Sequence, residues 1–432
     1  MQTMPHSIPG FIEDRLAKPA AVFGGAVSGQ GTVELLARLG ASAVVYDRKG
    51  GGAEPVFGAD DARRHGLVVF SPGFAPDHPW IRTATGAGCL CLGELDFASL
   101  FWTGPVIAIT GTNGKTTLTE FLAHALNKSG HAAVAAGNIG YPFSRLVQQG
   151  LASDATAVCE LSSFQAETVQ HLAPAATLWT NLAEDHLERH GSMSAYFDAK
   201  ARLLARTAPG MRWVGSSVAG WAARVGRPLE GVNVIDTAAP PADARLAGAP
   251  FASMPQRENF EIAKAYWCAS GLDLDILYAA AANFRIGRHR LSRVATKDGV
   301  SFWNDSKATN FHAVIGALAN FDAPVRWIGG GRSKGGDIAR FVRDIATRVA
   351  RGYLIGETAG ELERAAASAN IDVVRCDSLR DAVTRAWRDS RNGEHILLSP
   401  GFASFDQFKG YEDRGDQFEA IVAELTSHTV SP

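Results

Sequence analysis

Short apolar runs alternate with longer stretches of helical periodicity along most of the chain. The first runs predict strands at 20–23 and 43–46, with a helix from about 30 to 39 between them, and a third run follows at 67–70. This alternation is typical of parallel sheets whose faces are covered by helices. The sequence therefore predicts an α/β fold, with ligands at the carboxyl ends of the strands.

Two further series of the same kind follow. One begins at 106–110, directly after the breaker pair Gly104-Pro105, and includes runs at 155–159 and 176–180. Because 432 residues exceed one ordinary core, three successive α/β units are expected. The last series starts at 301, with apolar runs at 325–328, 352–355, 371–374 and 395–398.

Composition and charge narrow the classes of partner. Hydrophobic residues make up 46% of the chain and charged residues 20%, as in globular proteins, and the net charge is −2. No global field therefore attracts nucleic acid or an anionic membrane. The stretch from about 234 to 250, rich in alanine and proline, is expected to be a variable connection.

Cysteine usage and hydropathy indicate the compartment. The five cysteines are scattered and lack the paired spacing of a zinc or redox site, which fits a reducing environment. We find neither an export signal at the N-terminus nor an apolar run of about 18 residues. A cytoplasmic protein without membrane insertion is expected.

The string TGTNGKTT, between a predicted strand and an amphipathic helix, predicts a phosphate-binding loop. Its glycines let backbone N–H groups turn inward, the helix N-terminus adds partial positive charge, and Lys115 can reach terminal phosphate oxygens. The general consensus requires glycine where Ile109 stands, so the loop is a tighter variant. The expected ATP contacts are Gly111, Thr112, Asn113, Gly114, Lys115, Thr116 and Thr117.

Polar residues also follow the neighbouring predicted strands. Glu160 stands at the end of one strand, and His186 lies in the string DHLERHG after the next. The hydroxyl of Thr116 and the carboxylate of Glu160 suit a magnesium ion, and His186 suits a second metal. These residues predict a shared metal site, while nucleotide-binding motors, switches and kinases stay open at this point.

The motifs in their order resemble the ATP-dependent Mur ligases of bacterial peptidoglycan synthesis, over nearly the whole chain. Besides the loop, they are GNIG (137–140), ELSSFQ (160–165), DHLERHG (185–191) with Tyr196 and Lys200 downstream, His289-Arg290, NDSKATN (304–310), GGRSKGGD (330–337) and the segment 397–418.

The resemblance implies a three-domain architecture. A Rossmann-like N-terminal domain (1–104) would bind the uridine diphosphate of the substrate, a P-loop domain (105–287) would bind ATP, and a Rossmann-like C-terminal domain (288–432) would bring the amino acid. The substrates implied are UDP-N-acetylmuramoyl-L-alanine and D-glutamate, joined through an acyl phosphate, and the chain is expected to be a monomer. ATP and two Mg²⁺ ions are the implied cofactors.

The resemblance also assigns residues. Lys200 matches a lysine that carbon dioxide carbamylates, which would make it a ligand of the second Mg²⁺. The catalytic residues implied are Lys115, Glu160, His186 and Lys200. The metal ligands implied are Thr116, Glu160, His186 and Lys200. Further ATP contacts would come from Asn259, Arg290, Asp305 and Lys307. The substrate contacts implied are Asp47, Arg48, Ser71, Pro72, Gly73 and Asn138, with Thr309, Lys334, Ser399 and the backbone of Phe408 around glutamate.

Several positions depart from the family pattern. Ala26 replaces a usual glycine of the first loop, PQREN (255–259) keeps only the last asparagine of HNxxN, and Ser292 replaces the acid of HRxE. Three alternatives therefore stay open. The chain could be a related ligase that adds another amino acid or extends folate, an enzyme that takes L-glutamate, or a nucleotide-binding regulatory module without catalysis.

Overall fold

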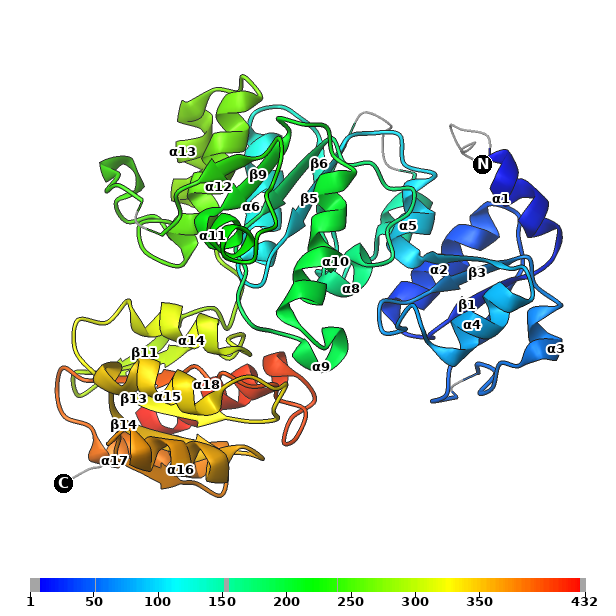
Figure 1. The fold of residues 1–432 in the computed structure, drawn as a ribbon. Helices are drawn as coiled ribbons and strands as arrows, with labels where there is room; N and C mark the ends of the chain where they lie inside the picture. The colour runs from blue at the N-terminus through cyan, green and yellow to red at the C-terminus, as the bar shows by residue number, and fades with distance from the viewer. Residues whose placement is uncertain (1–7, 51, 151–154, 239, 428–432) are drawn as a thin grey trace. The chain divides into compact units, whose positions relative to one another are not determined.

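The computed structural model describes residues 8–50, 52–150, 155–238 and 240–427, and contains three predominantly parallel sheets covered by helices (Figure 1). Two compact units are formed. The first comprises the chain to residue 182 together with 194–249 and 258–284, and it holds the first two sheets. The second comprises 183–193, 250–257 and the chain from 285 onward, and it holds the third sheet.

The first sheet has the strand order β2-β1-β3-β4, and all its strands are parallel. Because Phe23 pairs with both Tyr46 and Phe70, the residues that follow these three strands lie at one edge. The elements are α1 (Gly10–Glu13), η1 (Asp14–Ala17), β1 (Ala20–Phe23), α2 (Val27–Arg38), β2 (Ala43–Tyr46), α3 (Ala59–Ala62), β3 (Leu67–Phe70), α4 (Pro79–Gly86), β4 (Leu90–Gly93) and α5 (Glu94–Ser99).

The second sheet is also parallel, in the order β10-β9-β8-β5-β7-β6, and its central strand β5 is fully buried. The elements are β5 (Val106–Thr110), α6 (Lys115–Lys128), β6 (Ala133–Gly137), α7 (Phe143–Gln148), β7 (Thr156–Glu160), α8 (Ser163–Ala166), β8 (Ala176–Trp179), α10 (Met193–Ala205), β9 (Arg212–Gly215), α11 (Ser216–Arg224), β10 (Asn233–Ile235), η2 (Ala244–Leu246), α12 (Gln256–Ala269) and α13 (Leu274–Asn283).

The third sheet has the order β11-β12-β16-β13-β14-β15, with β11 antiparallel to β12. Its strand order reverses between β13 and β16, which is where ligands bind in open α/β sheets. The elements of the second unit are α9 (Leu187–His190), β11 (Ser292–Lys297), β12 (Val300–Asn304), α14 (Phe311–Leu318), β13 (Val325–Gly330), α15 (Ile338–Ile345), η3 (Ala346–Arg348), β14 (Val349–Ile355), α16 (Ala359–Ser368), β15 (Val373–Arg375), α17 (Leu379–Asp389), β16 (His395–Leu398) and α18 (Tyr411–Ser427).

The predicted α/β class is confirmed, each of the three predicted series of strands forms its own sheet, and most predicted strands lie within one or two residues of those observed. Helix α2 begins three residues before its prediction and α6 also begins earlier, since Gly114 adopts a left-handed conformation that ends the loop at Lys115. The stretch 234–250, expected to be a variable connection, contributes most of β10 and all of η2.

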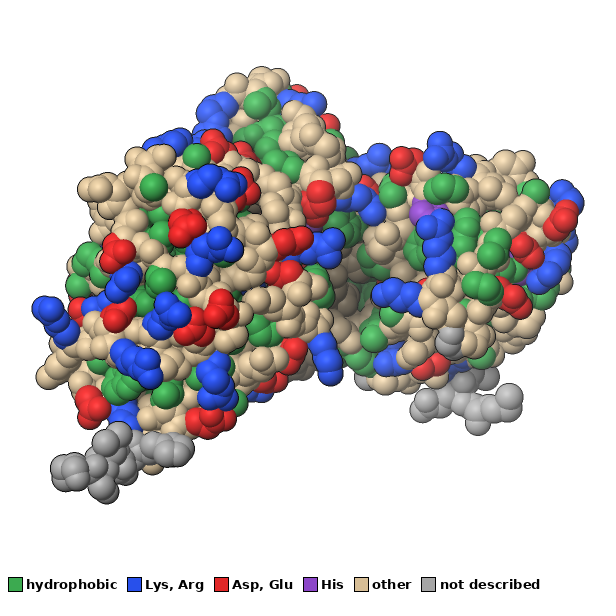
Figure 2. Space-filling view, turned by 90° about the horizontal axis from the view of Figure 1, so that it is seen from below, with side chains coloured by type: hydrophobic (Ala, Val, Ile, Leu, Met, Phe, Trp, Pro, Cys, Tyr) green, Lys and Arg blue, Asp and Glu red, His purple; other side chains and the backbone are tan. Residues whose placement is uncertain are grey.

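The surface agrees with the balanced composition. Basic and acidic side chains are interspersed on the face displayed in Figure 2. Within the described ranges, no helix combines the length and the apolar character needed to cross a bilayer.

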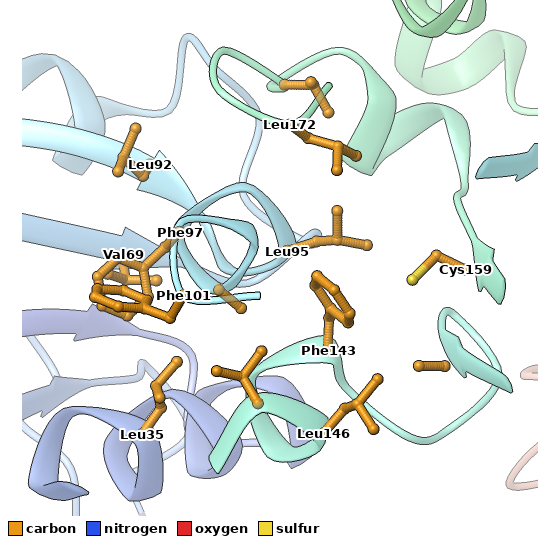
Figure 3. Close-up of a cluster of buried hydrophobic side chains, with 14 of the residues drawn as sticks. Leu35, Val69, Leu92, Leu95, Phe97, Phe101, Phe143, Leu146, Cys159 and Leu172 are labelled. Carbon is orange, nitrogen blue, oxygen red and sulfur yellow. The ribbon is translucent and has the colours of Figure 1, made fainter. Parts of the chain in front are cut away.

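Helix α5 joins the first two sheets through both its apolar and its acidic side chains. Leu95, Phe97 and Phe101 pack in one hydrophobic cluster with Phe143 of α7 and Cys159 of β7 (Figure 3). Asp96 accepts hydrogen bonds from the backbone N–H groups of residues 170, 171 and 172, at 3.0, 2.8 and 2.8 Å. The two sheets of the first unit therefore share one core and are fixed by charge-assisted hydrogen bonds.

Glu94 is the second acid of this junction, and it is almost fully buried. Its Oε1 accepts from the backbone N–H of Ser144 in the first turn of α7 at 2.7 Å, while Oε2 has no hydrogen-bond partner in the described structure. Burial raises the pKa of Glu94 above its ordinary value of 4.5, despite the opposing hydrogen bonds from Ser144.

This raised pKa predicts a pH-dependent stability. Folded Glu94 binds its proton more tightly than the unfolded chain does, so its contribution is fully present below pH 4.5 and is lost as the pH rises through the folded pKa. We expect Glu94→Gln to become more stable than the native chain as the pH increases from 5 to 9. Urea unfolding followed by tryptophan fluorescence measures this difference.

The matched control is Asp60→Asn, because the Asp60 side chain is 91% exposed and pairs only with Arg63 at the surface. Its stability should follow that of the native chain at every pH. An equal pH dependence in the native chain and in Glu94→Gln would contradict the prediction.

Candidate functional site

The phosphate-binding loop fits its surroundings so closely that its two glycines cannot carry side chains. A Cβ on Gly111 would lie 1.9 Å from Thr180 Oγ1, and one on Gly114 would lie 2.2 Å from Asn259 Oδ1. Both glycines also have positive φ angles, 146° and 83°. The loop is therefore a built feature in which the backbone must approach its ligand and its neighbours directly.

Strand pairing brings the predicted magnesium ligands together. Glu160 pairs with Ile109 of β5 and with Gly137 of β6, so its carboxylate lies at the edge where the loop begins. Thr116 donates to Glu160 Oε2 at 2.6 Å, and Asn138 Nδ2 donates to Oε1 at 2.9 Å. A buried carboxylate and a hydroxyl thus converge at the first turn of α6.

Two lysines converge on one carbonyl oxygen of the loop. Lys115 Nζ donates to the oxygen of Gly111 at 3.0 Å, and Lys200 Nζ donates to the same oxygen at 2.8 Å. The Lys200 side chain is 1% exposed, and its Nζ lies 4.8 Å from the ring centroid of Tyr196. The structure therefore places Lys200, found by resemblance alone, beside the loop and away from solvent.

Asn181 connects the loop to α12. It lies two residues after the end of β8, next to Thr180. Its backbone oxygen accepts from Thr112 N at 3.0 Å, and its Oδ1 accepts from Asn113 N at 2.9 Å. Its Nδ2 donates to the oxygen of Asn113 at 3.3 Å and to Glu258 Oε2 at 3.2 Å. Neither Asn181 nor Glu258 was among the predicted site residues, although the position of Asn181 after a strand was a usable signal.

The second unit contains a narrow pocket of about 20 Å³ at the reversal of strand order in the third sheet. Lys334 Nζ lies 3.4 Å from both Asp185 Oδ1 and Thr309 Oγ1. Asn310 Nδ2 donates to Asp185 Oδ2 at 3.2 Å. The pocket is lined by Glu184, Asp185, Leu187, Thr309, Asn310, Phe311, Lys334, Gly335, Gly336, Gly401 and Phe402.

His186 lies next to this pocket in a left-handed conformation, with φ 54°. Its Nδ1 lies 3.4 Å from Glu188 Oε1 and its Nε2 lies 3.8 Å from Asp185 Oδ2. Burial and the nearby Lys334 lower the pKa of His186, whereas the adjacent carboxylates raise it. Over the described ranges, no three or more His, Cys, Asp or Glu side chains are gathered to hold a metal ion.

Asp305 and Ser399, predicted for different ligands, contact each other. Ser399 Oγ donates to Asp305 Oδ2 at 2.8 Å, and the backbone N–H of Leu291 donates to Oδ1 at 3.0 Å. Burial raises the pKa of Asp305 to about 7, while Ser399, Leu291 and the nearby Arg290 lower it. Ser399 is fully buried, so its hydroxyl serves this contact within the third sheet.

Two other predicted residues of the second unit have contacts outside this pocket. The ammonium of Lys307 stacks 3.7 Å from the ring centroid of Tyr411. Phe408 lines a different pocket of about 360 Å³, together with residues of α17 and α18, and its backbone N–H donates to the oxygen of Ser404 at 2.9 Å. The structure therefore brings Lys334 and Thr309 together, while the backbone contact expected of Phe408 stays a prediction.

The predicted residues of the first sheet share its carboxyl edge. Asp47 accepts from the backbone N–H of Gly25 at 2.8 Å, and this bond is the main cause that lowers the pKa of Asp47. Pro72 and Gly73 form a turn, closed by the Phe74 N–H on the oxygen of Ser71. Ser71 Oγ is buried without a hydrogen-bond partner in the described structure.

Two further details concern this edge. Arg48 lies with its guanidinium 5.6 Å from the ring centroid of Trp80. Ala26, which departs from the family pattern, has φ −77° and ψ −167°, a conformation open to any residue. The alanine therefore introduces no backbone strain at the N-terminus of α2.

Two protein-family models match the parts of the chain that form the second and the third sheet. The Mur ligase middle domain matches residues 109–217, and the Mur ligase glutamate ligase domain matches residues 289–402. A relative named UDP-N-acetylmuramoylalanine–D-glutamate ligase from Pelotomaculum thermopropionicum is 35% identical over 83% of this chain and 84% of its own. One of the same name from Caldanaerobacter subterraneus is 31% identical over 94% of this chain and 98% of its own.

Solved structures agree on the fold. A pseudomurein peptide ligase type C from Methanothermus fervidus gives a TM-score of 0.60 at 15% identity, covering 94% of this chain and all of that one. The UDP-N-acetylmuramate-alanine ligase MurC from Thermotoga maritima gives 0.59 at 14% identity, with the same coverage. With its relatives above 30% identity over most of its length, this chain belongs to the Mur ligase family.

Proposed function

We propose that this chain uses ATP to join D-glutamate to UDP-N-acetylmuramoyl-L-alanine, a step of peptidoglycan precursor synthesis. The observation that carries the proposal is the phosphate-binding loop with Thr116 against Glu160, in a chain 31% identical over 94% of its length to a relative of that name. A cytoplasmic reaction is part of this proposal, supported by a nucleotide-linked substrate and by ATP. A monomer suffices, because each predicted contact comes from this one chain.

The reaction follows from the weakness of a carboxylate as an electrophile. The muramoyl-alanine carboxylate attacks the γ-phosphorus of ATP, forming an acyl phosphate as ADP leaves. The glutamate amine, after losing a proton, attacks the carbonyl carbon, and inorganic phosphate leaves as the amide forms. The first step brings two anions together, so positioning, the positive charge of Lys115 and the partial positive charge at the N-terminus of α6 lower the barrier.

The oxygen donors beside the loop fit magnesium. Mg²⁺ prefers one or two carboxylates together with substrate phosphates and water, and the hydroxyl of Thr116 with the carboxylate of Glu160 offers that set. When bound, the ion neutralises charge on the phosphoryl oxygens. Asn138 then keeps the Glu160 carboxylate oriented through its hydrogen bond to Oε1.

The environment of Lys200 supports its carbamylation. Lys200 is buried and shares the carbonyl oxygen of Gly111 with Lys115, so its Nζ lies away from bulk water and beside the loop. The neutral amine adds carbon dioxide and releases one proton, leaving an anionic carbamate. That anion would serve a second Mg²⁺ as an oxygen ligand.

The pocket at Lys334 suits a dicarboxylic amino acid. Lys334 and Thr309 offer an ammonium and a hydroxyl to a carboxylate, and Asp185 offers a carboxylate to the ammonium of the incoming amino acid. Phe311, Phe402 and the two glycines after Lys334 leave an apolar wall for methylene groups. A glutamate entering the pocket would replace Asp185 as the partner of Lys334.

The first prediction concerns the substrates. We expect phosphate release from ATP only when UDP-N-acetylmuramoyl-L-alanine and D-glutamate are both present. A coupled phosphate assay over D- and L-glutamate, other amino acids and a folate acceptor tests this expectation. Lys334→Met should raise the KM for D-glutamate at least tenfold, on the order of one lost charged contact.

The control in this assay is Lys409→Met, which removes a lysine of the same unit that does not line the pocket. It should behave as the native chain. Turnover with L-glutamate, with folate or with no added amino acid would overturn the proposed specificity.

The second prediction concerns Lys200. Lys200→Ala should lose at least about a hundredfold of kcat, because the anionic ligand is gone, and short carboxylic acids should restore part of it. Mass spectrometry of the intact native chain, trapped under carbon dioxide, should show the added carboxyl group. Full activity of the variant, or loss without rescue by acetate, would contradict the carbamate role.

A further inference from the structure

We infer that Glu258 is a positioning residue of the ATP site, which holds the phosphate-binding loop in place through Asn181. This inference rests on the proposed use of ATP. Glu258 lies in the first turn of α12, in the segment PQREN that departs from the family pattern. Within the described residues, Glu258 reaches the loop only through its hydrogen bond with the Asn181 side chain.

The position of Asn181 makes its orientation important. Its Oδ1 accepts from the backbone N–H of Asn113, and its Nδ2 donates to the oxygen of the same residue. An amide turned by 180° would offer a donor to that N–H and an acceptor to that oxygen, so both contacts would be lost. The orientation of this one side chain therefore decides whether the loop backbone is held.

Glu258 selects the productive orientation. Its Oε2 lies 3.2 Å from Asn181 Nδ2, and an oxygen accepts only from the amide nitrogen. The Asn181 amide is thereby fixed at both ends, by the loop and by α12. The next residue of α12 is Asn259, which packs against Gly114: a Cβ built on Gly114 would lie 2.2 Å from Asn259 Oδ1. The same turn of α12 therefore supports the loop at two points.

The charge of Glu258 is compatible with this place. Burial raises the pKa of Glu258 to about 7, against the lowering effect of the Asn181 hydrogen bond. A carboxyl that gives up its proton only near neutrality places less negative charge behind a loop built for phosphates than an ordinary carboxylate would. Both of its forms retain an oxygen that accepts from Asn181.

Three variants of the full chain test the role. Glu258→Leu keeps the bulk but removes the acceptor, and we expect the KM for ATP and the dissociation constant of ADP to rise about tenfold, the effect of one hydrogen bond. The kcat and the KM values of the other two substrates should change less than about twofold. Glu258→Gln retains the acceptor and should restore nucleotide affinity.

The matched control is Glu261→Leu, the same change one turn further along α12, which should leave nucleotide affinity unaltered. A double-mutant cycle separates positioning from general destabilisation. If Glu258 acts through Asn181, adding Glu258→Leu to Asn181→Ala costs no further affinity for ADP.

Unchanged ADP affinity in Glu258→Leu would overturn the inference, as would a loss of ADP affinity in Glu258→Gln equal to that in Glu258→Leu. Additive losses of ADP affinity in the double variant would also contradict it. So would an equal rise of all three KM values together with a lower melting temperature. Direct ADP binding by calorimetry keeps this test separate from the proposed reaction. A chain that binds ADP but never turns over D-glutamate would refute the function and leave the role of Glu258 standing.

Discussion

The parallel register of β5 with β7 and β8 is the constraint on which the ATP site depends. It sets Ile109 opposite Glu160 and Thr110 opposite Trp179, so three strand ends deliver the loop, a carboxylate and Asn181 to one edge. Successive residues of a strand point to opposite faces, so a slip of β7 by one residue would turn Glu160 away from Thr116. The buried apolar strands that fix this register are therefore as necessary to the chemistry as the polar residues at their ends.

Much of this edge could be predicted from the sequence, because its signals are local. Lys115 and Thr116 begin the helix after the loop that follows β5, and Glu160 ends β7, which pairs with β5, so strand ends and spacing indicate that they lie at one edge. Lys200 has no such signal. It lies in the middle of α10, and only packing against the loop buries it, which is why resemblance and not pattern identified it.

Pairings between distant polar residues were beyond local reasoning. Asp305 and Ser399 each follow a strand, and their hydrogen bond depends on β12 and β16 being neighbours, although these strands are far apart in sequence. The same holds for Asn181 and Glu258, which meet because α12 returns to the loop. Phe408 lies in the same motif as Ser399 and lines a pocket together with α17 and α18, a neighbourhood that the motif alone does not indicate.

The two units treat charge in opposite ways. In the second unit, Lys334 is compensated by Asp185, so a ligand carboxylate must compete with a group already in place. In the first, Lys115 and Lys200 approach the same carbonyl oxygen, so two ammonium groups share one acceptor. The proposed polyphosphate ligand would bring negative charge to both lysines, and the proposed carbamate would make Lys200 itself an anion. These two changes oppose each other, because a carbamate repels phosphate oxygens, so a cation such as the proposed Mg²⁺ is needed between them for both to be present at once.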